Sequence, residues 1–414
     1  MKEQLRIQGD YKARRRAPNG TSENEGPYYN GNSMKIRSSS FFNLANISVS
    51  PSMSSIKHTL LAALIAALGS NPAQAQNTSA PYLNTLAQSA GKLWFGTAMD
   101  TTTGEVSDSA YMTVFNETQI FGQTTPGNTM KWEFTEPSQG VFTFAEGEET
   151  IALAKATGKK VRCHNLVWSS ELPSWVTGGT WTNETLLAAM ETHIKTEVEY
   201  YGDGCWSWDV VNEALDSDGG FTSNVFYETI GAAYVPLAFR YAYEAVQSLG
   251  VDIKLFYNDY GIEYSGTKHT AALALIQTIQ GWNNAYIDGV GFESHYSTSW
   301  GASKASQLEG MSDFAELGVQ IQVTELDVGC SAVPCSTSDL ATQAQIYYDT
   351  VSACMDTEEC TGMTVWDFDD EYSWIQPADY DGEGDPCLYY SDLSRHPAYT
   401  AVAEAIQGID CSVC

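Results

Sequence analysis

Asp209-Val210-Val211-Asn212-Glu213-Ala214 is the stretch that decides the fold of this chain. A short apolar run, from Trp208 to Val211, ends here in an amide and a carboxylate. A buried parallel strand ends in this way when its C-terminal tip carries chemistry. The stretch Val323-Thr324-Glu325-Leu326-Asp327 repeats the pattern, with an apolar strand and a glutamate at its tip. The two stretches predict strands of one barrel whose glutamates act as a pair.

Short apolar stretches of this kind alternate with helical patterns along the chain. We expect strands over residues 93–99, 121–125, 160–164, 206–212, 254–258, 289–294, 319–324 and 362–366. Helical patterns lie between them, for example over 186–200, 236–247 and 341–353. An open doubly wound sheet would normally carry a glycine-rich phosphate loop after an early strand, and the sequence has none. Eight strands over about 330 residues therefore predict an α/β fold with a single (β/α)8 TIM barrel.

The charge of the chain narrows the choice of partners. Its 414 residues contain 51 Asp and Glu against 21 Lys and Arg, which gives a formal net charge of −30. Such a charge argues against nucleic acid and against anionic membranes, because both are themselves negatively charged. We expect a monomer that binds a neutral ligand.

The N-terminal part reads as two segments that precede the barrel. Residues 1–52 are polar and basic, and we expect them to be a disordered upstream extension from a mis-assigned start. Residues 53–75 have a charged start, an apolar run over 59–68 and the cleavage site Ala73-Gln74-Ala75, which indicates a signal peptide. The apolar run is about half as long as a membrane-spanning helix. We therefore expect a secreted chain, 76–414, with glycosylation sequons at Asn77, Asn116 and Asn183.

The nine cysteines suggest disulfides if the chain is secreted. No pair of CxxC motifs exists, so we expect no structural zinc site. Cys163 lies in an apolar strand and is the best candidate for a free thiol. Two close pairs could each close a small loop, namely Cys330/Cys335 and Cys354/Cys360.

Polar and aromatic side chains follow most of the expected strands. The C-terminal tips of all strands in such a barrel face the same mouth, so these side chains should converge on one cleft. Each alone is more readily explained as structural, but chance explains the whole set poorly. The set is Asn128, Lys131, His164, Trp168, Asn212, Glu213, Asn258, Tyr260, His295, Glu325, Asp327, Trp366 and Trp374.

Two carboxyl groups across one cleft suit the hydrolysis of a glycosidic bond. That reaction needs one protonated carboxyl and one ionised carboxylate. His295 can bridge Glu325 and Asp327, which would keep Glu325 ionised as the nucleophile. Glu213 lies beside Asn212, and partial desolvation would keep Glu213 protonated. We expect this chemistry to need neither a cofactor nor a metal.

Eight motifs of the chain resemble glycoside hydrolase family 10, the endo-β-1,4-xylanases. The resemblance runs from about residue 83 to 406, and WDVVNEA and TELD are its most specific parts. The motifs are FGTAMD (95–100), NTMKWEFTEPSQGVFTF (128–144), HNLVWSSELPSW (164–175), WDVVNEAL (208–215), YNDY (257–260), GFESH (291–295), VTELD (323–327) and GMTVW (362–366).

The resemblance implies roles for the residues of these motifs. Glu213 would be the acid/base and Glu325 the nucleophile of a retaining hydrolase, with His295 and Asp327 supporting Glu325. Asn212 would bind the 2-hydroxyl of the sugar at the cleavage point. Asn258 and Tyr260 would lie close to the bond that is cut. The glycone side would be lined by Asn128, Lys131, His164, Trp168, Trp366 and Trp374. The family's disulfide before the last strand would correspond to Cys354–Cys360.

The chain departs from the family pattern on the sugar-binding side. Gly127 stands where the family usually has Glu, and Glu171 and Glu293 stand where it usually has Gln. These changes predict weaker cleavage of xylan, unless a protonated Glu donates where the amide did. Two alternatives follow: a tomatinase-like enzyme that acts on another β-linked glycoside, such as a plant steroidal glycoalkaloid, and an inactive barrel that binds carbohydrate or protein.

Overall fold

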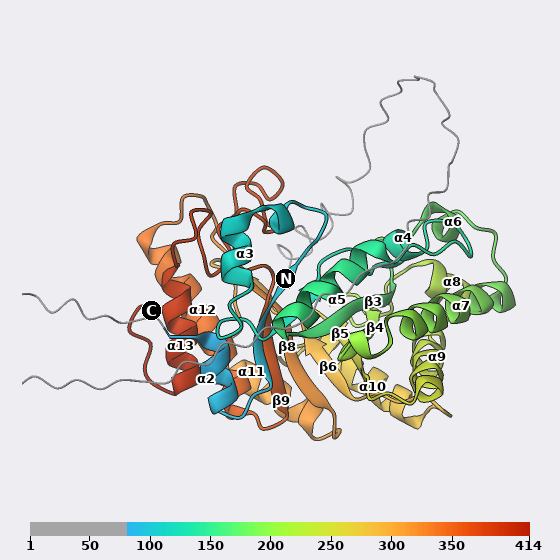
Figure 1. Ribbon diagram of the computed structural model, residues 1–414. Coiled ribbons are helices and arrows are strands. Elements are labelled where there is room, and N and C mark those ends of the chain that lie inside the picture. Colours follow the sequence, from blue (N-terminus) through green and yellow to red (C-terminus); the bar gives the residue numbers. More distant parts are fainter. Residues whose placement is uncertain (1–80) are drawn as a thin grey trace, which may run out of the picture. The chain divides into compact units, whose positions relative to one another are not determined.

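The structure is a computed structural model that describes residues 81–414 (Figure 1). The expectations for residues 1–52, for the signal peptide over 53–75 and for Asn77 lie outside the described residues. None of the helices between residues 81 and 414 is both long and apolar enough to cross a membrane.

Eight parallel strands close into a barrel, which confirms the predicted (β/α)8 fold. β1 pairs with β9 and β6 pairs with β8, so the sheet has no open edge between these strands. The short β7 (His295–Ser297) lies outside the ring and pairs only with β8. The barrel strands are β1 (Trp94–Met99), β2 (Gln123–Pro126), β3 (Lys160–Trp168), β4 (Ser207–Asn212), β5 (Lys254–Asp259), β6 (Gly289–Phe292), β8 (Gln320–Gly329) and β9 (Cys360–Val365).

Helices surround the strands, which lie in the centre of the unit (Figure 1). Several helices begin at a side-chain cap: the hydroxyl of Thr182 accepts from the Thr185 N–H at the start of α7, and Asp108 caps α3 in a similar way. The helices are α2 (Leu83–Ser89), α3 (Ser109–Phe115), α4 (Trp132–Thr135), α5 (Ala145–Thr157), α6 (Ser174–Thr177), α7 (Asn183–Tyr201), α8 (Val225–Ile230), α9 (Tyr234–Leu249), α10 (Thr267–Gly281), α11 (Lys304–Ala315), α12 (Thr337–Asp356) and α13 (Pro397–Gln407), with 3-10 turns η1 (Glu105–Ser107) and η2 (Gly202–Gly204).

The barrel interior contains a polar layer. Arg162 on β3 is 1% exposed, and its Nε donates to Asp209 Oδ2 on β4 at 3.1 Å. Its Nη1 donates to Gln322 Oε1 on β8. His164 Nδ1 reaches the same Asp209 carboxylate at 2.9 Å. A buried charge is tolerable only when it is paired. This layer therefore ties three strands together beneath the mouth of the barrel.

The cysteine pairing corrects one expectation. Cys163 is not free: it forms a disulfide with Cys205, across a Cα–Cα distance of 5.7 Å. The partners are 42 residues apart in sequence, but β3 and β4 are neighbouring strands. Cys387 is the free cysteine, and it is buried. The remaining pairs are Cys330–Cys335, Cys354–Cys360 and Cys411–Cys414.

Candidate active site

Glu213 and Glu325 line one cleft at the C-terminal mouth of the barrel. The cleft is open to solvent and contains about 980 Å³ of empty space. Glu213 directly follows β4, and its backbone N–H donates to Asn258 O at 3.0 Å. Its φ of 48° is left-handed, a conformation that costs free energy for any residue but glycine. The surrounding structure therefore holds Glu213 in a defined position.

Most of the residues expected at the strand tips line the same cleft. They come from strands and loops all around the mouth, as the barrel geometry requires. They are Asn128, Lys131, His164, Trp168, Asn212, Glu213, Glu293, His295, Glu325, Trp366 and Trp374.

Asn258 and Asp327 lie behind this lining. Both are fully buried, and both hold residues that face the cleft. Asn258 Nδ2 donates to Glu325 Oε1 and to Asn212 Oδ1, each at 2.8 Å. Asp327 Oδ2 accepts from Trp374 Nε1 at 2.7 Å and lies 3.0 Å from His295 Nδ1. The two residues therefore position the groups that line the cleft.

Tyr260 and Glu171 are also outside the lining. Burial raises the pKa of Tyr260, and the charge of Glu213 raises it further, which puts Tyr260 near Glu213. Glu171 has a left-handed φ of 50°, and its carbonyl accepts from the Glu133 N–H at 2.9 Å. Its side chain is half-buried beside the cleft. Of the three departures from the family pattern, only Gly127 and Glu293 therefore line the cleft.

The electrostatics of the site favour an ionised Glu325. Burial alone would raise the pKa of Glu325, but a hydrogen bond from His295 and the charges of His164 and His295 outweigh it, so the pKa is lowered. Burial disfavours the charged form of His295 as well and so lowers its pKa. The charge of Asp327 and the hydrogen bonds to Asp327 and Glu325 outweigh this effect and raise the pKa to about 10. His295 is therefore an imidazolium that bridges two carboxylates.

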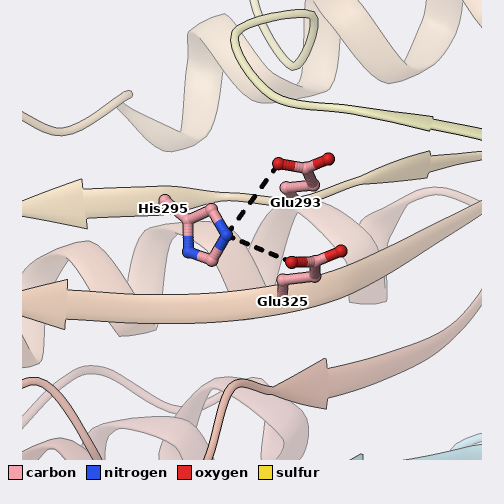
Figure 2. A group of neighbouring side chains, drawn as sticks. All are labelled: Glu293, His295 and Glu325. Atoms are coloured by element: carbon pink, nitrogen blue, oxygen red, sulfur yellow. Dashed lines mark hydrogen bonds and ion pairs between the residues drawn. The ribbon is translucent and has the colours of Figure 1, made fainter. Parts of the chain in front are cut away.

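Glu293, His295 and Glu325 come close enough together to raise the question of a metal ion (Figure 2). One ligand atom from each lies within 4.8 Å of the other two. His295 Nε2 is 3.2 Å from Glu325 Oε2 and 3.9 Å from Glu293 Oε2. An imidazolium carries a proton on both nitrogens and has no lone pair for a metal. With a pKa of about 10, His295 places a positive charge among these carboxylates at neutral pH.

Asp100 is a cleft residue that the sequence reasoning missed. It follows β1 and closes the FGTAMD motif, and that position at a strand tip is the signal that could have identified it. Asp100 Oδ2 accepts from Asn128 Nδ2 at 2.7 Å, and Lys131 Nζ donates to Asn128 Oδ1 at 2.9 Å. Lys131 Nζ also lies 4.9 Å from the centre of the Trp168 ring. Other lining residues that were missed are Thr103, Glu105, Ser170, Asp367 and Tyr372.

Comparison with known proteins adds to this geometry. The model of the family described as glycosyl hydrolase family 10 matches residues 82–405. Endo-1,4-beta-xylanase D of Talaromyces funiculosus is 45% identical over 351 residues, which are 84% of this chain and 82% of that protein. The solved structure of Penicillium canescens endo-1,4-beta-xylanase XylE has a TM-score of 0.78 and 48% identity, and the match covers 80% of this chain and 99% of that one. A GH10 xylanase from Bispora sp. MEY-1, solved with xylobiose, has a TM-score of 0.76 and 46% identity, with coverage of 78% and 99%.

Proposed function

Because the chain belongs to glycosyl hydrolase family 10, we propose that it is a secreted endo-β-1,4-xylanase that hydrolyses internal bonds of xylan with retention of configuration. The observation that carries this proposal is the pair Glu213 and Glu325 in one cleft. The relatives named as xylanases, including one solved with xylobiose, support the choice of substrate.

The proposed reaction has two displacements. In the first, Glu325 attacks the anomeric carbon while Glu213 gives its proton to the leaving oxygen, so that a glycosyl-enzyme forms. In the second, Glu213 takes a proton from water, and the water oxygen displaces Glu325. The lowered pKa of Glu325 supports its role as nucleophile. The left-handed backbone at Glu213 supports a position set by function rather than by chain preference.

The remaining cleft residues would orient the sugar. Asn212 accepts a hydrogen bond from Asn258 and so presents its own N–H groups to the cleft, where a 2-hydroxyl would lie. Tyr260 would lie on the aglycone side, near Glu213. The aromatic faces of Trp168, Trp366 and Trp374, with Asn128, Lys131 and His164, would form the glycone side.

Replacing each glutamate tests the mechanism. Glu325→Ala should abolish turnover, because no glycosyl-enzyme can form. Glu213→Ala should slow xylan cleavage by about 10²- to 10⁴-fold, but should slow aryl glycosides with good leaving groups much less. Azide should restore part of the rate. Glu149→Gln, the same kind of change at an exposed position on α5, is the control.

Two readouts decide whether the proposal holds. Proton NMR at early times should show the β-anomer first, and an α-anomer would mean an inverting reaction. Sugar release from xylan should exceed release from a steroidal glycoalkaloid. If wild-type protein cleaves the glycoalkaloid and leaves xylan intact, the tomatinase-like alternative replaces the xylanase proposal.

Secretion has its own test. We propose that the segment over 53–75 directs export and that the mature chain begins near Gln76. Asn116 and Asn183 are both exposed, so each could carry a glycan in a eukaryotic host. N-terminal sequencing of the secreted protein should start near Gln76. A mature protein that contains Arg14-Arg15-Arg16 would contradict the proposal.

A further inference from the structure

Glu293 lies beside the proposed nucleophile and shares two partners, Asn258 and His295, with Glu325. It follows β6, its backbone N–H donates to Asp259 O at 3.1 Å, and the residue is 1% exposed. Its side chain lines the cleft and lies next to Glu325 and His295 (Figure 2). The proposed mechanism gives it no role, yet a third carboxyl among reacting groups must affect them.

The side-chain amide of Asn258 has fewer hydrogens than it has acceptors around it. Asn258 Nδ2 lies within hydrogen-bond distance of three oxygens, namely Glu325 Oε1 at 2.8 Å, Asn212 Oδ1 at 2.8 Å and Glu293 Oε1 at 3.2 Å. The amide orientation follows from the Glu325 carboxylate, which only accepts, so that Nδ2 faces it, while Asn258 Oδ1 accepts from Thr324 Oγ1 at 2.7 Å. An amide nitrogen carries only two hydrogens. An ionised Glu293 would therefore compete with Glu325 for one of them.

The two cations near Glu293, His295 and Lys268, each lie closer to another carboxylate, although the charge of Lys268 lowers the pKa of Glu293 in part. His295 Nε2 is nearer to Glu325, at 3.2 Å, than to Glu293, at 3.9 Å. Lys268 on α10 is bound to Asp259 at the end of β5, with 2.7 Å between Nζ and Oδ1. The other charged groups that act on Glu293 are carboxylates: Glu325 on β8, Glu213 after β4 and Asp259 on β5. Burial first, and then the charges of Glu325 and Glu213, raise the pKa of Glu293 well above its usual range.

We propose that Glu293 is a positioning residue that must carry a proton for the enzyme to work. A neutral Glu293 is a weak acceptor, so it leaves the Asn258 amide and the His295 imidazolium to Glu325. An ionised Glu293 takes a share of both and adds a third negative charge to the cleft. The family's usual Gln is always neutral, whereas Glu293 makes the alignment of Glu325 dependent on pH. This inference rests on the proposed function, because it concerns the same reaction.

The test removes the titration of Glu213 first. In the variant Glu213→Gln, a substrate with a good leaving group, such as 2,4-dinitrophenyl β-xylobioside, needs no acid in the first step. kcat/KM would then be measured from about pH 4 to about pH 9, which stays below the pKa of about 10 of His295, whose proton the site also needs. We expect kcat/KM to fall about tenfold per pH unit above the pKa of Glu293, because one proton is still required. In the double variant Glu213→Gln/Glu293→Gln, it should change less than about twofold over the same alkaline range.

The outcomes separate the inference from the proposed function. If kcat/KM of the single variant Glu213→Gln does not fall at alkaline pH, the role of Glu293 is overturned. The same holds if kcat/KM of the double variant Glu213→Gln/Glu293→Gln falls as steeply as that of the single variant. If even wild-type protein does not cleave the xylobioside at any pH, it is the proposed function that fails. The control is Glu213→Gln/Glu149→Gln, in which the second substitution is at an exposed position on α5. Its kcat/KM should still fall at alkaline pH.

A second measurement does not depend on activity. Carboxyl-¹³C NMR of wild-type protein labelled at glutamate should contain, beside the resonance of the buried Glu197, a further resonance that titrates well above the ordinary range, since Glu293 is buried among carboxylates. The Glu293→Gln variant should lack that resonance. A wild-type spectrum in which all cleft carboxyl groups titrate in the ordinary range contradicts the proposal.

Discussion

At the residue scale, the carboxylate of Asp100 lies next to Gly127, where the family usually has a glutamate. A Cβ on residue 127 would lie 3.3 Å from Asp100 Oδ2, so the carboxylate of Asp100 already occupies the neighbourhood of the missing glutamate. Asp100 also holds Asn128, which in turn holds Lys131. This part of the cleft therefore has a carboxylate although residue 127 provides none. Asp100 follows β1 and closes FGTAMD, one of the motifs that resemble the family.

The corresponding prediction concerns Gly127→Glu. The new carboxylate would meet Asp100, and two like charges about 4 Å apart repel each other by about 1–4 kcal/mol. We expect the KM for xylo-oligosaccharides to rise in Gly127→Glu and to recover in Gly127→Glu/Asp100→Ala. Asp100→Ala alone should lower kcat/KM by about 5- to 150-fold, because Asn128 loses its acceptor.

Gly281→Glu is the control for added charge, since a side chain there meets no atom within 4 Å. If Gly127→Glu by itself improves xylan cleavage, Asp100 does not replace the missing glutamate.

At the scale of elements, the break between β6 and β7 places His295 between Glu325 and Asp327. The sequence pattern predicts one strand over 289–294, but the strand ends at Phe292. Ser294 has a φ of 59°, and its N–H donates to Glu263 Oε1 at 2.8 Å. The chain then enters β7, which pairs with β8 in a register that sets His295 opposite Asp327. If β6 continued without a break, His295 would not lie opposite Asp327 in this register.

At the scale of the whole molecule, buried carboxyl groups shape the pH dependence of stability. Burial raises the pKa of ten described carboxyls, whereas four have a lowered pKa: Asp108, Glu244, Glu325 and Asp392. The ten are Glu105, Glu197, Asp259, Glu263, Asp288, Glu293, Asp327, Asp367, Asp369 and Asp385. Because carboxyls with a raised pKa outnumber those with a lowered pKa, the folded state is more stable at acidic pH than at alkaline pH.

The sign follows from proton binding. Below about pH 3, these ten groups are protonated in both states and have no effect on the pH dependence. As pH rises, the unfolded chain loses the protons first, so stability falls by up to about 1.4 kcal/mol per pH unit for each group, until its folded pKa is reached. We expect the free energy of unfolding and the Tm to be higher near pH 5 than near pH 8.

Glu197 on α7 makes this prediction specific. It is fully buried, and the nearest basic atom is His193 Nε2 at 3.5 Å. Glu197→Gln keeps the shape and removes the titration, so it should stabilise the protein by about 1–3 kcal/mol at pH 8 and much less at pH 5. Glu199→Gln, which is exposed on the same helix, is the control. Calorimetry that gives parallel Tm profiles for wild type and Glu197→Gln would falsify it.

The sequence by itself determined the order of the strands, the barrel and the glutamate pair. Each of these depends on a local pattern: an apolar run marks a buried strand, and the residue after the run lies at its tip. Because all tips of a parallel barrel share one mouth, Glu213 and Glu325 could be placed together without knowledge of any contact. The departures at Gly127, Glu171 and Glu293 could also be recognised, though not their consequences.

Only the tertiary structure decided which residues touch. Cys163 meets Cys205 because two strands are neighbours, although 42 residues separate them in sequence. Asp100 lies beside Gly127 because β1 and β2 pair, whereas Glu171 is not among the residues that line the cleft. Asn258 serves Glu325 and Glu293 at once because three strands converge on it. Distances of a few ångströms between distant parts of the chain set these contacts, and no local pattern contains them.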